Sequence, residues 1–148
     1  RILYKDCNKG FILDGFPRTI TQAISFEKIL NNFEKKVNCV IQIDVTENIL
    51  LKRITGREIC AECSAVYNIY YDPMPSNGCK YCGSIKKPVI RSDDKEKAFK
   101  NTRLKKYNDE TKPLIEFYNK KKILYKFDGS GSASKIGDNI LKFISTLK

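Results

Sequence analysis

RITGREICAECSAVYNIYYDPMPSNGCKYCGSIKKPVIRSDD, residues 53–94, carries four cysteines in two C-x2-C pairs. The pairs are Cys60 with Cys63 and Cys79 with Cys82, and fifteen residues separate them. Two residues between cysteines let one tight turn aim both sulfurs at a single tetrahedral centre. The spacing predicts a zinc site, with two disulfides or four unrelated thiols as the alternatives. The lysine-rich composition, without a recognisable signal peptide, favours zinc.

The segment between the two cysteine pairs has the pattern of a small hairpin. AVYNIYY is typical of a strand and PMPSNG of a turn, and Gly78 and Gly83 supply permissive backbone beside the second pair. The segment has too few apolar residues to fold alone, and a structural zinc would supply the missing stabilisation. Arg53 and Arg57 precede the cysteines and Arg91 follows them. This arrangement suggests a lid over an anionic ligand.

The composition limits the classes of function. The length of 148 residues suits about one domain, and no apolar run approaches a membrane span, so we expect no membrane partner. The net charge is +11, but 22 scattered lysines against 6 arginines produce it, and we therefore expect no nucleic-acid partner. The scarce arginines are more informative, because guanidinium groups grip phosphate in a fixed geometry. The chain has no histidine, which excludes imidazole chemistry.

Hydrophobic periodicity predicts strands and helices in alternation. Before the cysteines we expect the end of a helix at 1–9, a strand at 11–14, a turn at 15–18, a helix at 19–35, a buried parallel strand at 38–45, and a helix at 47–54 capped by Thr46. After them we expect a helix at 95–120 capped by Asp93 and Asp94 and kinked at Pro113, a strand at 123–129, a loop at 130–134, and a helix to 147 with Ile136, Ile140, Leu141, Ile144 and Leu147 facing inward. This order predicts an α/β fold whose parallel sheet is covered by helices on both faces.

Several motifs together resemble the adenylate kinases of the long, zinc-lid type. They run in order along the chain: DGFPRTITQA at 14–23, RITGR at 53–57, the four cysteines, VY at 66–67, YDP at 71–73, RSDD at 91–94, RLKKY at 103–107, TKPLIEFY at 111–118 and DGSGS at 128–132. The resemblance implies a P-loop nucleoside monophosphate kinase fold, with a core at 1–55 and 94–148 and a zinc-binding β lid at 56–93. No G-x-x-x-x-G-K-[ST] motif occurs, so the family layout implies about seventy further residues upstream.

The resemblance also implies a role for each matched residue. Arg18, Arg57, Arg91, Arg103 and Asp14 would be catalytic, with Asp14 holding magnesium through water. The AMP site would comprise Gly15, Phe16, Pro17, Arg18, Gln22, Arg91 and Arg103. The ATP site would comprise Arg53, Arg57, Val66, Tyr67, Tyr71 and Gly131, the last through its carbonyl. Cys60, Cys63, Cys79 and Cys82 would bind zinc.

The implied activity is reversible phosphoryl transfer from ATP to AMP, and without a phosphate loop the chain alone should be inactive. Family habit suggests a monomer in the cytosol, with mitochondria as the alternative. A kinase of the same fold that uses GTP with AMP, a zinc-ribbon nucleic-acid-binding module, and an inactive relic are the rival functions. One departure bears on Arg103, because the gap from RSDD to RLKKY is one residue longer than the family pattern. An extra residue in a helix rotates all later side chains by about 100° around the helix axis.

Overall fold

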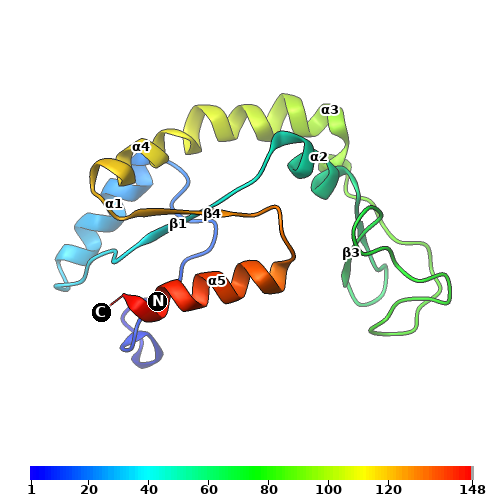
Figure 1. Cartoon of the computed structure of the whole chain (residues 1–148), viewed down its shortest axis with the longest axis horizontal. Helices are drawn as coiled ribbons and strands as arrows, with labels where there is room; N and C mark the ends of the chain where they lie inside the picture. Colours follow the sequence, from blue (N-terminus) through cyan, green and yellow to red (C-terminus); the bar gives the residue numbers. More distant parts are fainter. Residues whose placement is uncertain (148) are drawn as a thin grey trace.

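A sheet of two parallel strands lies at the centre of the computed structural model, which describes residues 1–147. Strand β1 (Val40–Asp44) pairs with β4 (Leu124–Asp128) in register from Val40 opposite Leu124 to Asp44 opposite Asp128. Helix α5 (Ala133–Thr146) covers one face, and α1 (Ile20–Asn31) and α4 (Pro113–Lys120) cover the other (Figure 1). The predicted α/β class with helices on both faces is confirmed. Strand β1 is less buried than expected, since Ile43 is 53% exposed.

The first fourteen residues differ from prediction. Residues 1–9 contain only a 3-10 turn, η1 (Lys5–Cys7), instead of the end of a helix. Residues 11–14 form no strand, and Ile12 is 83% exposed. A strand requires a ladder of hydrogen bonds to a neighbour, and no segment within residues 1–147 pairs with this one. Apolar character alone could not reveal that.

Side-chain caps mark the starts of three helices, and only the cap at Thr46 was predicted. Thr19 caps α1 by accepting from Gln22 N, and Thr46 caps α2 (Glu47–Thr55) by accepting from Ile49 N. Ser132 caps α5 in the same way. The inward face predicted for α5 is correct for buried Ile136 but wrong for Leu141, which is 65% exposed. Phe143, two residues later, packs on Tyr125 and Phe127 of β4, so Leu141 lies on a different side of the helix from the one that meets the sheet.

The long helix predicted at 95–120 forms with two π-helical turns. It comprises α3 (Glu96–Ala98), the π segments η3 (Phe99–Leu104) and η4 (Tyr107–Thr111), and α4. The change from π to α geometry falls at Pro113, the first residue of α4. The predicted caps are wrong: Asp93 and Asp94 lie in a 3-10 turn, η2 (Ser92–Asp94), and neither caps the helix, because both face arginines.

The core fixes the sheet against α1 and α4. Ala23, Leu114 and Tyr118 are buried together, and partly buried side chains of Val40, Phe117, Ile123 and Leu124 pack on them. At the carboxyl end of the sheet Gly129 donates from its N to Asp44 O at 2.7 Å. A Cβ on Gly129 would lie 2.5 Å from Ile43 Cγ2, so only glycine lets the loop after β4 cross here. This crossing positions residues 130–132 beside the base of the hairpin formed by residues 57–68.

This hairpin is a second, antiparallel sheet, which follows the carboxyl end of α2. Strand β2 (Arg57–Ile59) pairs with β3 (Val66–Asn68), and this hairpin lies apart from the parallel sheet (Figure 1). A hairpin forms, but not the predicted one: only Val66–Asn68 of AVYNIYY is a strand, its partner precedes the cysteines, and the turn spans the first cysteine pair instead of PMPSNG. An isolated bridge joins Ile59 to Val89. Within residues 1–147, every helix is too short or too polar to cross a membrane.

Candidate active site and metal centre

A buried carboxylate joins two arginines from distant segments. Asp94 is 1% exposed and receives both Nε and Nη2 of Arg57, at 2.7 and 2.5 Å. Arg103 Nη1 reaches the same carboxylate at 2.8 Å. Arg57 lies at the start of β2 and Arg103 in η3, so the ion pairs tie the base of the hairpin to the long helix. The sequence motifs predicted both arginines in the site but gave no role there to Asp94.

A second carboxylate extends the cluster to Arg91. Asp93 accepts from Nε and Nη2 of Arg91, both at 3.1 Å, and lies 3.4 Å from Arg103 Nη2. We call Arg57, Arg91, Asp93, Asp94 and Arg103 the arginine cluster. Three guanidinium groups against two carboxylates leave one excess positive charge, and Arg91 and Arg103 are partly exposed. The cluster is therefore able to accept an anion.

Electrostatics stabilise the charged form of this cluster. The hydrogen bonds from Arg57 hold the pKa of Asp94 below its usual value, against the effect of burial. The bond to Asp94 raises the pKa of Arg57 in turn. The carboxylate therefore stays ionised and holds the guanidinium plane in a fixed orientation.

The π segment η3 bears on the placement of Arg103, which it contains, whereas η4 follows that residue. A π turn uses one more residue than an α turn, as the bond from Lys112 N to Tyr107 O shows (2.8 Å). Widened turns of this kind absorb an extra residue inside a helix without changing its ends. The structure brings Arg103 against Asp94 with the longer gap present.

The GFPR turn presents Arg18 at the start of α1. Gly15 has φ +67°, and its carbonyl accepts from Arg18 Nε at 2.7 Å. A Cβ at Gly15 would lie 2.9 Å from Arg18 Nη2, so glycine suits this close approach. Arg18 N donates to Gln22 Oε1 at 2.8 Å, which brings these two predicted residues together. Phe16 precedes Pro17 through a cis peptide bond and packs edge-on against Phe26.

Asp14 stands immediately before this turn and is exposed. It makes no side-chain hydrogen bond to another residue within 1–147. The structure therefore leaves its carboxylate free to act at the surface.

A cleft of about 920 Å³ lies between the hairpin and the carboxyl end of the sheet. Its lining includes all six residues predicted to contact ATP: Arg53, Arg57, Val66, Tyr67, Tyr71 and Gly131. Arg53 Nη2 donates to Gly131 O at 3.3 Å across the cleft. Arg57 belongs both to this cleft and to the arginine cluster, so the two features adjoin.

Sequence reasoning missed other residues of the cleft. Ser132, the cap of α5, and Ile136 both line it. Asn68 Nδ2 donates to the carbonyls of Lys52 and Arg53 at 3.3 and 3.1 Å. Asn68 thus satisfies the last carbonyls of α2 and links that helix to the hairpin. A polar residue ending a strand gave no signal of this contact in the sequence.

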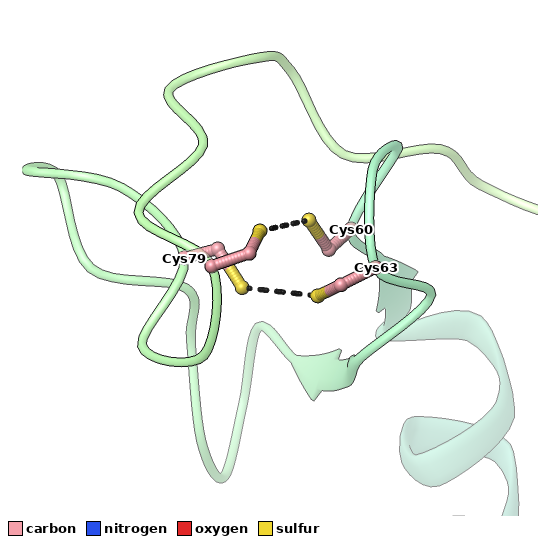
Figure 2. Close-up of side chains that lie close together, drawn as sticks. Cys60, Cys63 and Cys79 are labelled. Carbon is pink, nitrogen blue, oxygen red and sulfur yellow. Dashed lines mark hydrogen bonds between the residues drawn. The ribbon is translucent and has the colours of Figure 1, made fainter.

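Four cysteine sulfurs converge between two loops. Cys60 Sγ lies 3.7 Å from Cys82 Sγ, and Cys63 Sγ lies 3.5 Å from Cys79 Sγ. All four sulfurs lie within 4.8 Å of one another, and the labelled side chains of Cys60, Cys63 and Cys79 point toward a common centre (Figure 2). Tetrahedral zinc with bonds of about 2.3 Å requires sulfurs about 3.8 Å apart. The donor set and its spacing fit zinc.

The two loops repeat one backbone pattern. Cys60 O accepts from Ser64 N at 3.0 Å, and Cys79 O accepts from Gly83 N at 2.8 Å. Ser64 and Gly83 occupy equivalent places and both have positive φ, of 60° and 71°. Gly83 supplies the permissive backbone predicted beside the second pair, and Ser64 adopts the same left-handed conformation in the first loop. All six cysteines are free thiols.

Tyr67 stabilises the sulfur cluster through its hydroxyl. Its ring is buried, and its hydroxyl lies 3.2 Å from Cys79 Sγ and accepts from Lys80 N at 2.8 Å. The bond from Tyr67 lowers the pKa of Cys79 to about 6, which favours the thiolate that a metal requires. The hydroxyl of Tyr67 therefore joins the hairpin to the second cysteine loop.

Comparison with known proteins identifies the family. The family described as adenylate kinase matches residues 1–123. The chain belongs to the adenylate kinase family. It is 40% identical to an adenylate kinase of Nitrosococcus oceani over 149 positions, which cover 100% of this chain and 68% of that protein.

Two further relatives agree. An adenylate kinase of Thermodesulfovibrio yellowstonii is 41% identical over 95% of this chain and 64% of its own length. An adenylate kinase of Archaeoglobus fulgidus is 41% identical over 100% of this chain and 67% of its own length. The chain thus spans about two thirds of the length of these adenylate kinases. Membership confirms the predicted P-loop nucleoside monophosphate kinase fold and the class of phosphotransferase.

Proposed function

We propose that the whole protein containing this chain transfers the terminal phosphoryl group of ATP to AMP, reversibly, giving two ADP. One observation carries the proposal: Arg57 belongs both to the arginine cluster and to the cleft lined by the residues expected to contact ATP. Family membership supports the same reaction class. The activity belongs to the complete protein, because the sequence has no phosphate-loop motif.

Phosphoryl transfer needs positioning and charge neutralisation more than it needs a protein nucleophile. In this proposal Arg53 and Arg57 hold ATP, and Arg91 and Arg103 face the transferring group. Arg18 binds the phosphate of AMP, and Gln22 contacts its adenine. Magnesium bound with ATP would neutralise charge on the phosphates, with Asp14 holding it through water.

ATP is the proposed donor in preference to GTP. Gly131 O faces the cleft and accepts from Arg53. A carbonyl there pairs with the exocyclic amine of adenine, whereas guanine has a carbonyl oxygen at that position. Arg53 would exchange this contact for the nucleotide.

We propose that residues 56–93, which contain the hairpin and both cysteine pairs, form a lid. This lid moves as one body between two core segments, 1–55 and 94–148. Zinc bound by Cys60, Cys63, Cys79 and Cys82 would supply the rigidity that so small an apolar core, mainly Tyr67 and its neighbours, lacks. A rigid lid confines motion to its two ends and excludes water from the closed site.

An assay of the complete gene product tests the function. We expect ADP to form from ATP and AMP, with at least about ten-fold lower kcat/KM when GTP replaces ATP. Equal use of GTP would move the assignment to the related GTP-using kinase. No ADP from either donor, together with salt-dependent binding of an oligonucleotide, would favour the zinc-ribbon alternative.

A further inference from the structure

One hydrogen bond joins the GFPR turn to the long helix. The hydroxyl of Thr111 donates to the carbonyl of Arg18 at 3.0 Å, across 93 residues of sequence. Within residues 1–147 it is the only side-chain hydrogen bond between residues 14–18 and any residue beyond Gln22. A single group therefore makes the polar connection between these two parts of the molecule.

The other contacts of the turn are local. Arg18 bonds to Gly15 and Gln22, and Phe16 packs on Phe26 of α1. These contacts fix the shape of the turn and attach it to α1. Helix α1 in turn packs on α4 through apolar Ala23, Leu114 and Tyr118, so the bond from Thr111 is the polar link of the turn itself to the long helix.

Thr111 lies on the same helical stretch as Arg103. It is the last residue of η4, and Arg103 lies eight residues earlier, a rise of about 12 Å at helical spacing. Arg103 bonds to Asp94 of the cluster, while Thr111 bonds to the turn that carries Arg18. The helix therefore spans from one set of anion-binding arginines to the other.

We propose that Thr111 is a positioning residue that sets where Arg18 stands relative to the arginine cluster. This rests on the proposed function, in which Arg18 binds the phosphate of AMP. The contact is exposed, so water can bond to the Arg18 carbonyl when the Thr111 hydroxyl is lost. The free energy of unfolding therefore changes little, while Arg18 is no longer held in position for the phosphate of AMP. The phosphate contact then becomes weaker, and contacts to ATP in the cleft stay as they are.

The test compares three variants of the complete protein. Thr111→Val removes the hydroxyl at nearly constant volume, Thr111→Ser restores it, and Thr102→Val removes an exposed hydroxyl from the same helix. We expect Thr111→Val to raise KM for AMP about three- to ten-fold, the value of one net hydrogen bond, and to leave KM for ATP within about two-fold. Thr111→Ser and Thr102→Val should match the wild type, and Tm should change little in all three.

The outcomes separate this proposal from the function on which it depends. Wild-type turnover with an unchanged KM for AMP in Thr111→Val would overturn the role of Thr111 alone. An equal rise in KM for both nucleotides, or no recovery in Thr111→Ser, would also overturn it. If Thr111→Val does not fold, Thr111→Ala carries the same expectation. Failure of the wild type to use AMP would instead overturn the proposed function.

Discussion

Arg18 makes no side-chain contact with a carboxylate in residues 1–147, so its guanidinium remains available for a phosphate. The planar fork of arginine matches a phosphate through two donors, whereas lysine offers a point charge. We expect Arg18→Lys to lower kcat/KM for AMP in the complete protein about 10- to 100-fold, the value of one charge-assisted hydrogen bond. Arg1→Lys is the matched control, because Arg1 pairs with exposed Asp6 far outside the site motifs. A wild-type kcat/KM for AMP in Arg18→Lys would count against the assignment.

Asp94 is the residue whose role the sequence concealed. An Asp-Asp pair before a helix is typical of a cap, and the partners that override this, Arg57 and Arg103, lie 37 and 9 residues away. We expect Asp94→Asn to lower the free energy of unfolding by about 2–4 kcal/mol, because two arginines lose a buried counter-charge. Asp93→Asn, at a carboxylate 45% exposed, should cost less than about 1 kcal/mol. Urea unfolding of both variants measures the difference, and similar small losses would contradict the anchoring role.

The pH dependence of the same variant gives a second check. Because the folded pKa of Asp94 is lowered, its contribution is complete above the unfolded value of about 3.9 and is lost as the pH falls through the folded value. The stability gap between wild type and Asp94→Asn should therefore be constant from pH 7 to about 5 and shrink below about 4. A gap that widens on acidification would show that the carboxylate is not ionised in the folded protein.

At the scale of elements, local signals predicted well and non-local ones did not. Thr46 caps α2 as expected, because a cap depends on residues within one turn. Thr19, predicted as the first helical residue, caps α1 and lies just outside it. The strand expected at 11–14 needed a partner that periodicity does not reveal, and the segment forms no ladder with any strand of residues 1–147. The π turns in the long helix were equally invisible, because an extra residue in sequence does not say whether a loop or a helix absorbs it.

The cysteine loops are the element best predicted by spacing, and metal content tests them. We expect about one zinc per chain in the purified wild type, and well under half of that in Cys63→Ser, since one of four ligands is lost. Cys39→Ser is the matched control, because Cys39 lies outside the sulfur cluster and should leave zinc content unchanged. Metal analysis alongside thiol titration measures both quantities. Near-zero zinc in the wild type, with all thiols free, would remove the metal claim.

At the scale of the whole molecule, the candidate site draws on segments far apart in the chain. The sequence placed Arg57, Arg91 and Arg103 in one site through family motifs, and the structure brings them together around two carboxylates. It did not predict the network that holds them, Asp94 and Asn68 above all, because those contacts depend on the packing of the hairpin against the long helix. Motifs therefore predict which groups act on a ligand better than they predict what orients those groups.

The central claim is that guanidinium groups from separate segments meet around one pair of nucleotides. The most direct test is a crystal structure of the complete protein bound to one molecule in which ATP and AMP are joined through their phosphates. We predict that Arg18, Arg57, Arg91 and Arg103 all place a guanidinium nitrogen about 3 Å from phosphate oxygens, with the hairpin closed over the cleft. Arg18 facing solvent on one side while Arg57 and Arg91 bind no phosphate on the other would contradict it.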